Sequence, residues 1–318
     1  MTIIVSGSLA FDRLAEYGGM FTDLILPEQL NILNVCFLVD KVERFHGGTA
    51  GNIAYNLALL GESPFVVSSV GDDPDGKDYL AKLKEWGLDP SGIKTDPERA
   101  TAGAYIATDR AERQLIFFNP GAMQGETALG WEDLPKGPSG EVLGIVSPGG
   151  FSDMKIMSSM YRDNNAPFIF DPGQQVPAFT GEELLGMLDG ASLLVVNEYE
   201  LKLFLEKMAL PADGLFRYAQ AVLVTLGEKG SRLDTPRGSQ HVLPVRAGSV
   251  VNPTGAGDAY RAGLLKGLKS KLPVLSACRL GSAVASFCVE APGTQEHRFT
   301  LDEALDRVRR TFKEDLKI

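Results

Sequence analysis

Short apolar runs rich in β-branched residues recur along the chain and alternate with segments of helix length. Glycine, proline, asparagine or aspartate bounds each run, a pattern typical of strands buried on both faces of a mainly parallel sheet. The predicted strands are 3–5, 65–67, 145–146, 168–170, 193–196 and 221–224. Apolar residues at three- and four-residue spacing predict helices at 50–60, 76–86, 182–189, 199–208, 257–270, 273–290 and 301–314. We therefore expect a doubly wound α/β core.

Two stretches break this alternation and predict extended strands. One covers 33–45, and the other is a hairpin of strands 101–108 and 113–118. We expect both to form a small inserted β-sheet that acts as a lid over one edge of the core. A surface decoration of β structure is the alternative that the periodicity leaves open. The resulting division assigns to the core 1–11, 46–99 and 121–318, and to the lid 12–45 and 100–120.

The composition narrows the possible partners. Of the 318 residues, 44% are hydrophobic and 23% charged, as in an ordinary folded protein, and the formal net charge is −10. This acidic balance argues against a nucleic-acid partner. No apolar run approaches the ~20 residues of a membrane span and the start lacks a signal peptide, so we expect a cytoplasmic protein with no membrane partner. The three cysteines and three histidines show no spacing typical of a metal site.

Polar residues follow several of the predicted strands. Asp171, Asn197 and Thr225 each end an apolar run, and Asp12 follows the first strand. Ligands of an open parallel sheet bind at the carboxyl ends of its strands, so these residues are candidates for a common site. Each of them also fits a plain helix cap. The shared position of these residues at strand ends therefore carries more weight than any one of them.

The strongest local motif is Gly255-Ala256-Gly257-Asp258, which opens a predicted helix. The free N–H groups and the dipole of a helix N-terminus attract an anion, and small residues let it come close. Asp258 is placed to take a proton from a nearby hydroxyl while the backbone amides stabilise charge on a transferred group. The alternative is an acid that stabilises the helix dipole, beside glycines that serve tight packing.

A second glycine cluster, Gly47-Gly48-Thr49-Ala50-Gly51-Asn52, precedes another predicted helix. Adjacent glycines allow the backbone to approach a ligand closely, and the amide of Asn52 can both donate to and accept from a sugar diol. Asp12 would offer the same diol two acceptor oxygens. The glycine pair also fits a hinge between a lid strand and a core helix, and the two roles are compatible.

Four motifs occur in the order and approximate spacing of the ribokinase-like (PfkB) carbohydrate and nucleoside kinases, which the chain resembles over essentially its whole length. They are Gly47-Gly48-x-x-Gly51-Asn52, Asn197-x-x-Glu200, Thr225-x-Gly227-x-x-Gly230 and Gly255-Ala256-Gly257-Asp258. The resemblance implies a ribokinase-like α/β fold with a β-sheet lid. It also implies an enzyme that transfers a phosphoryl group from ATP to an alcohol.

The resemblance further implies the roles of single residues in this transfer. Asp258 would be the catalytic base, and the amides of Gly255, Ala256 and Gly257 would form the anion hole. Mg²⁺ and its waters would be organised by the pair Asn197 and Glu200. The remaining residues of the ATP site would be Thr225, Gly227 and Gly230.

On the acceptor side, the resemblance implies that sugar hydroxyls are held by Asp12, Gly48 and Asn52. Several segments are similar to bacterial members of the adenosine-kinase type, and a nucleoside also needs an apolar, aromatic slot for its base. The candidates for this slot, all on predicted lid strands, are Cys36, Phe37, Tyr105 and Phe118. Packing of these side chains inside the lid is the alternative.

The expected reaction is phosphorylation of a nucleoside primary hydroxyl, from adenosine to AMP, with ATP and Mg²⁺. The alternatives are a kinase for free ribose or a ketohexose and a non-catalytic ligand-binding protein. The family usually has aspartate at the position of Asn252, beside a monovalent-cation site, and the change argues against activation by K⁺. The exposed edge of a lid strand would also suit a homodimer formed through the lid.

Overall fold

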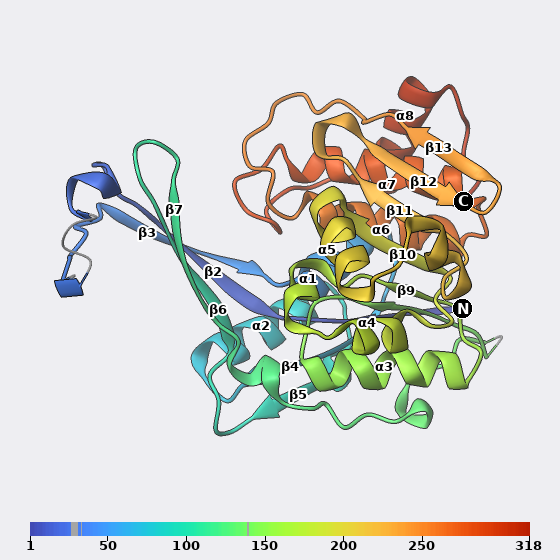
Figure 1. Cartoon of the computed structure of the whole chain (residues 1–318), viewed down its shortest axis with the longest axis horizontal. Helices are drawn as coiled ribbons and strands as arrows, with labels where there is room; N and C mark the ends of the chain where they lie inside the picture. Colours follow the sequence, from blue (N-terminus) through green and yellow to red (C-terminus); the bar gives the residue numbers. More distant parts are fainter. Residues whose placement is uncertain (27–30, 33, 139) are drawn as a thin grey trace.

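Most of the chain forms one large sheet covered by helices. The computed structural model describes residues 1–318 except 27–30, 33 and 139. Within these residues, seven parallel strands are followed at one edge by two antiparallel ones (Figure 1). In spatial order the strands are β5 (Ile93–Asp96), β4 (Phe65–Gly71), β1 (Thr2–Ser6), β8 (Val142–Val146), β9 (Phe168–Phe170), β10 (Leu193–Asn197), β11 (Val222–Thr225), β12 (Ser231–Thr235) and β13 (Gly238–Val242).

Helices pack on both faces of this sheet, which confirms the predicted doubly wound core. Successive side chains of a strand point to opposite faces, so Ile3 and Val5 belong to one apolar cluster and Ile4 to the other. The first cluster is completed by α1 (Thr49–Leu59), α2 (Pro74–Glu85), α6 (Ala256–Lys269) and α7 (Val274–Cys288). The second is completed by α3 (Phe151–Asp163), α4 (Gly181–Leu188) and α5 (Glu198–Met208), while α8 (Leu301–Phe312) packs on α7.

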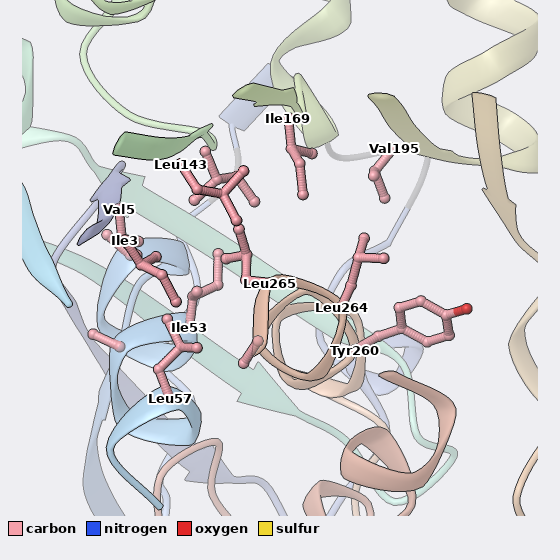
Figure 2. Close-up of a cluster of buried hydrophobic side chains, with 14 of the residues drawn as sticks. Ile3, Val5, Ile53, Leu57, Leu143, Ile169, Val195, Tyr260, Leu264 and Leu265 are labelled. Carbon is pink, nitrogen blue, oxygen red and sulfur yellow. The ribbon is translucent and has the colours of Figure 1, made fainter. Parts of the chain in front are cut away.

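Helix α6 is anchored along its length by apolar contacts. Figure 2 shows Leu264 and Leu265 of α6 directed toward side chains of the central strands and of α1. On the opposite side, α6 approaches α7 so closely that a Cβ on Gly263 would lie 2.8 Å from the Cα of Gly281. The N-terminus of this helix, which carries the Gly255 to Asp258 motif, is therefore held in a fixed place relative to the sheet.

A second, four-stranded sheet projects from the core (Figure 1). Its strands are, in order, β3 (Lys41–Gly47), β2 (Ala10–Glu16), β6 (Ala102–Thr108) and β7 (Gln114–Asn119). The hairpin of β6 and β7 agrees with the prediction, and the large and small sheets together confirm the predicted fold class. The division of the chain into core and lid, and closure of this sheet over a ligand, stay predictions.

The predicted strand 33–45 is wrong in its first part. Position 33 lies outside the described residues, 34–40 form no strand, and β3 begins at Lys41. The reason is a local aromatic cluster: the ring of Phe37 lies 5.1 Å from that of Tyr17 and 5.0 Å from that of Phe21. These ring contacts bury part of Phe37 without any strand pairing.

Ion pairs tie the second sheet to helix α2. Arg13 on β2 pairs with Asp75, and Arg44 on β3 places Nη1 2.7 Å from an oxygen of the same carboxylate. Arg44 also contacts Asp78, one turn along the helix. Two aspartates of α2 and one arginine from each of the two strands therefore form one charged link between this helix and the second sheet.

Strand β7 lies at the edge of the second sheet and carries exposed apolar side chains. Ile116, Phe117 and Phe118 are each at least half exposed to solvent. This supports the expected homodimer through the lid, which stays a prediction. Among the described residues, no helix has the length and apolar character needed to cross a membrane.

The packing of α6 predicts the effect of a truncated core side chain. Leu265→Ala removes a fully buried side chain, so we expect a loss of about 2–5 kcal/mol in the free energy of unfolding. Urea denaturation followed by circular dichroism measures this loss. The matched control, Ile156→Ala on α3, changes a side chain that is 38% exposed and should cost about 1 kcal/mol or less. Equal losses in the two variants would contradict the assignment of Leu265 to the core.

Candidate functional site

The N-terminus of α6 begins at a residue that has to be glycine. Gly255 caps the helix at φ +80°, a left-handed conformation that side chains rarely adopt, and a Cβ there would lie 2.8 Å from Cγ2 of Thr294. The first N–H groups of a helix have no partner within it, and here they belong to the small residues Ala256 and Gly257. The amide of Ala256 also makes a long hydrogen bond of 3.3 Å to the carbonyl of Pro253. The start of α6 therefore presents backbone donors with little side-chain volume around them.

Asp258 lies in the first turn of α6 and is the direct partner of Asn52. The amide Nδ2 of Asn52, near the start of α1, donates to Oδ2 of Asp258 at 2.8 Å. This bond joins the two glycine motifs of the sequence, which are 206 residues apart. Asn52, which is predicted to bind the sugar, and Asp258, which is predicted to act as the base, are therefore in direct contact.

Burial and neighbouring charges determine the ionisation of Asp258. Burial raises the pKa of its carboxyl to about 6, against the opposing effects of the Arg261 charge and the hydrogen bond from Asn52. The negative charges of Asp171 and Asp12 raise this pKa further. A carboxyl with a pKa near 6 is mostly ionised at neutral pH and is still basic enough to accept a proton.

Arg261, one turn further along α6, is a buried residue that sequence reasoning missed. Its guanidinium makes two contacts with the carboxylate of Asp171, one of them 2.7 Å between Nη2 and Oδ1. Its Nη1 also donates to the carbonyl of Gly257 at 3.0 Å. The available signal was a basic residue one turn after the glycine motif, together with an aspartate at a strand end. The two charges of the pair act on Asp258 in opposite directions: Arg261 lowers the pKa of its carboxyl and Asp171 raises it.

The acceptor-side candidates surround the same position. Asp12 on β2 is half-buried, and burial raises the pKa of its carboxyl. A Cβ on Gly47 would lie 2.7 Å from Oδ2 of Asp12, and one on Gly48, at φ +83°, would lie 2.5 Å from the carbonyl oxygen of Ser8. Gly48 is therefore required where the second sheet joins α1, whereas a side chain on Gly47 would displace the carboxylate of Asp12.

Asn197 and Glu200 form the N-terminal cap of α5. Oδ1 of Asn197 accepts from the amide of Glu200, and Oε2 of Glu200 accepts from the amide of Asn197, each at 2.8 Å. Burial raises the pKa of the Glu200 carboxyl. Among the described residues, no three His, Cys, Asp or Glu side chains converge in a way that could hold a metal. Mg²⁺ usually keeps several waters and needs only one or two carboxylates beside substrate phosphates, so Glu200 fits this mode of binding.

The predicted nucleotide residues lie beside this cap. Thr225 at the end of β11 is the register partner of Asn197 on the parallel strand β10. Gly227 and Gly230 turn the chain into β12 with φ values of +58° and +89°. A cavity of about 280 Å³ opens between α5 and the segment Gly173–Ala178 and is lined in part by Asn197 and Glu200. The structure thus brings the Asn197 and Thr225 motifs together, as their strand-end positions predicted.

The four candidates for a base slot are placed differently from one another. Phe118 pairs with Ala104, which pairs with Asp12, so these three residues lie in one row across the second sheet. Tyr105 faces the other side of the sheet, where its ring lies 5.1 Å from the guanidinium carbon of Arg13. Phe118 is therefore the strand aromatic that shares a face with Asp12.

The other two candidates do not lie on strands, contrary to the prediction. Cys36 is exposed in the segment before β3, and Phe37 packs against the rings of Tyr17 and Phe21. The aromatic cluster matches the alternative of packing inside the lid. A part for either residue in binding a base stays a prediction.

Asn252 uses both ends of its amide locally. Its Nδ2 donates to the carbonyl of Pro292 at 2.8 Å, and its Oδ1 accepts from the amide of Thr254 at 2.9 Å. An aspartate at this position could not donate to Pro292. The amide therefore replaces a negative charge with a hydrogen bond that holds the loop after α7, and the lack of K⁺ activation stays a prediction.

Comparison with known proteins decides the family. Residues 12–300 match the pfkB family carbohydrate kinases. The chain belongs to the PfkB family. This kinase is 30% identical over 275 residues to a protein of Methanocaldococcus jannaschii named nucleoside kinase, and the match covers 86% of this chain and 89% of that protein.

Solved structures agree with the family and confirm the ribokinase-like fold. The nucleoside kinase of Burkholderia thailandensis in complex with inosine superposes on this kinase with a TM-score of 0.87 at 32% identity, and the match covers 100% of both chains. The same protein in complex with ADP-inosine gives a TM-score of 0.84 at 34% identity over 99% of this chain and 98% of that one. The chain is therefore a carbohydrate or nucleoside kinase.

The buried ion pair predicts a large effect of a single substitution. Arg261→Met leaves Asp171 buried without its cation, so we expect the free energy of unfolding to fall by about 3–5 kcal/mol. Urea denaturation of the two proteins measures the difference. The double variant Arg261→Met/Asp171→Leu removes both charges and should recover most of the loss. A single variant as stable as the unmodified kinase would contradict the pair.

Proposed function

We propose that this kinase transfers the γ-phosphoryl group of ATP to the primary hydroxyl of a nucleoside, with adenosine as the predicted acceptor. Relatives named nucleoside kinases support the acceptor class. The Burkholderia thailandensis complexes with inosine and with ADP-inosine support a purine nucleoside and an adenine nucleotide. Adenosine and inosine differ only at the six-position of the base, so both belong in the test.

The observation that carries this proposal is the contact of Asn52 with Asp258 at the start of α6. The contact leaves Oδ1 of Asp258 for an acceptor hydroxyl, beside the backbone donors of Gly255, Ala256 and Gly257. In our proposal, Asp258 takes the hydroxyl proton as the oxygen attacks the γ-phosphorus in line. The backbone amides stabilise the negative charge of the transferred group.

Asp12, Gly48 and Asn52 would orient the ribose. Asn52 already donates one amide hydrogen to Asp258 and accepts one hydrogen bond from Gln295. One amide hydrogen and one lone pair of Asn52 therefore remain for a ribose hydroxyl. The carboxylate oxygens of Asp12 would accept from the same diol.

On the donor side, Asn197 and Glu200 would hold Mg²⁺ through its water ligands, while Thr225, Gly227 and Gly230 would line the site of ATP. When bound, Mg²⁺ would neutralise charge on the phosphates. Closure of the second sheet would exclude water from the transferred group. A kinase with a net charge of −10 needs these local devices because its surface offers no general attraction for ATP.

The alternative within the family is a kinase for free ribose or a ketohexose. The row of Asp12, Ala104 and Phe118 favours a nucleoside, because it places an aromatic ring on the face that would hold the sugar. A non-catalytic binding protein would not need a carboxylate with a pKa near 6 at a helix N-terminus. The sugar kinase and the binding protein each predict a result different from that of a nucleoside kinase when turnover is measured over a panel of acceptors.

Turnover over a panel of acceptors tests the proposal. Release of ADP from Mg-ATP should have its highest kcat/KM with adenosine, followed by inosine, and far lower values with ribose and fructose. Higher kcat/KM with a free sugar than with either nucleoside would establish the sugar kinase. Binding of adenosine measured by calorimetry, without turnover of any acceptor, would establish the binding protein.

Asp258→Asn tests the base. We expect kcat to fall by at least ~10²-fold with little change in the affinity for adenosine, since the amide cannot accept the proton. In the unmodified kinase, kcat/KM should fall as the pH drops below about 6, because the pKa of Asp258 is raised to that value and protonation removes the base. An unchanged kcat in the variant would remove Asp258 from this role.

A further inference from the structure

A chain of buried hydrogen bonds runs from the second sheet to Asp258 through a glutamine that none of the sequence motifs assigns. Gln295 lies in the loop between α7 and α8 and is only 3% exposed. Its Nε2 donates to Oδ1 of Asn52 at 2.8 Å and to the hydroxyl of Tyr79 at 2.9 Å. Tyr79, fully buried on α2, donates in turn to the carbonyl of Gly47 at 2.6 Å.

The two ends of this chain determine the direction of every bond in it. The carbonyl of Gly47 only accepts, so Tyr79 must use its single hydrogen there. The tyrosine oxygen can then only accept from Gln295, which must present its amide nitrogen. An ionised Asp258 also only accepts, so Asn52 must direct Nδ2 toward it and Oδ1 toward Gln295.

Gln295 is thus the one double donor in the chain, and its donation fixes the amide orientation of Asn52. A rotated Gln295 would place its oxygen against two other oxygens that have no hydrogen to offer. Its own Oε1 is buried and has no hydrogen-bond partner in the part of the chain that the structure describes. An unpaired buried carbonyl reduces stability. The arrangement therefore satisfies the hydrogen-bond acceptors of Asn52 and Tyr79 and leaves the carbonyl oxygen of Gln295 unpaired.

The same loop contacts the end of β3 and the start of α6. Oγ1 of Thr294 donates to the carbonyl of His46 at 3.0 Å, and its methyl group packs where a Cβ of Gly255 would lie. The loop therefore touches the last residues of the strand that leads into the second sheet and the helix that carries Asp258. A movement of β3 would therefore also displace this loop and, through it, the start of α6.

We propose that Gln295 is a positioning residue of the transfer site, which locks Asn52 so that it directs Asp258 and ties this arrangement to Gly47 at the end of strand β3. The inference rests on the proposed role of Asp258 as the base. With Oδ2 held by Asn52, Oδ1 of Asp258 keeps a fixed direction toward the acceptor hydroxyl. Both hydrogens of the Gln295 amide are used within the protein, by Asn52 and Tyr79, so in this proposal Gln295 acts through Asn52.

The proposal is tested with Gln295→Met, which keeps similar volume and removes both donors. We expect kcat with adenosine to fall by about tenfold with KM for ATP unchanged, because Asp258 loses its orientation. The acid limb of the kcat/KM profile should move to higher pH by about half a unit or more, because the ionised carboxylate loses support from Asn52. The charged and titratable groups that face Asp258, all unchanged in this variant, are Arg261 on α6, Asp171 after β9, Asp12 on β2, Tyr79 on α2 and Cys288 on α7.

A matched control separates positioning from a general loss of stability. Asn164→Leu also removes a side-chain amide donor, one that binds the carbonyl of Met160 at 2.9 Å at the end of α3, and should leave the pH profile unchanged. Thermal denaturation of both variants shows how much each loses in stability. If Gln295→Met changes neither kcat nor the acid limb, or no more than Asn164→Leu does, the positioning role is overturned.

A double-mutant cycle with Asn52→Ala tests the route of the effect. If Gln295 acts through Asn52, the kcat of the double variant should lie within about twofold of the Asn52→Ala value, since the second change has nothing left to misplace. Multiplicative losses in the double variant would overturn that route. If Asp258→Asn loses kcat while Gln295→Met keeps it, only the present inference is rejected. If Asp258→Asn keeps its kcat, the proposed base itself is rejected.

Discussion

A half-buried carboxylate at the N-terminus of α6 is the constraint on which the candidate site depends. Removing an ionised group from water is unfavourable, and the pKa of Asp258 near 6 records that cost. The helix dipole, the amide of Asn52 and the guanidinium of Arg261 oppose it. Asp171 and Asp12 add negative charge nearby, so the pairing of Arg261 with Asp171 prevents three carboxylates from acting on one another unscreened.

The fold supplies each of these groups from a different part of the chain. Parallel strands bring their carboxyl ends to one edge, which places Asn197 beside Thr225 and Asp171 on the neighbouring strand end. Tight packing of α6 on the sheet and on α7 keeps Asp258 in position. The second sheet contributes Asp12 and the glycine pair at the end of β3. In the proposed site, the groups that act in the transfer would come from both sheets, because neither sheet holds all of them.

Sequence patterns predicted the parts of the fold that depend on burial. The apolar runs located six of the seven parallel strands because those strands are covered on both faces. The edge strand β5 was missed, since its Lys94 and Thr95 are exposed. The patterns missed β2, β12 and β13, whose polar residues alternate or face solvent, and α3, whose buried Met154, Met157 and Tyr161 are separated by polar residues. Ring packing within a loop leaves no distinct pattern in the sequence. The apolar residues around Phe37 were therefore interpreted as part of a strand.

The candidate site was predictable where residues with complementary chemical roles are adjacent in the sequence. The run from Gly255 to Asp258 combines small residues with an acid, and that combination is visible without a structure. The partnership of Asn52 with Asp258, the pair of Arg261 with Asp171 and the donation by Gln295 join residues far apart in the chain. Each depends on tertiary geometry, which spacing along the sequence does not encode.

The charged link between α2 and the second sheet has a consequence for the angle between the sheets. Arg13 and Arg44 reach Asp75 and Asp78 at positions that water and dissolved ions can enter. Attraction between such half-exposed charges weakens as ionic strength rises. Higher ionic strength is therefore expected to loosen this link between α2 and the projecting strands, whereas the apolar contacts of the large sheet carry no charges for dissolved ions to screen.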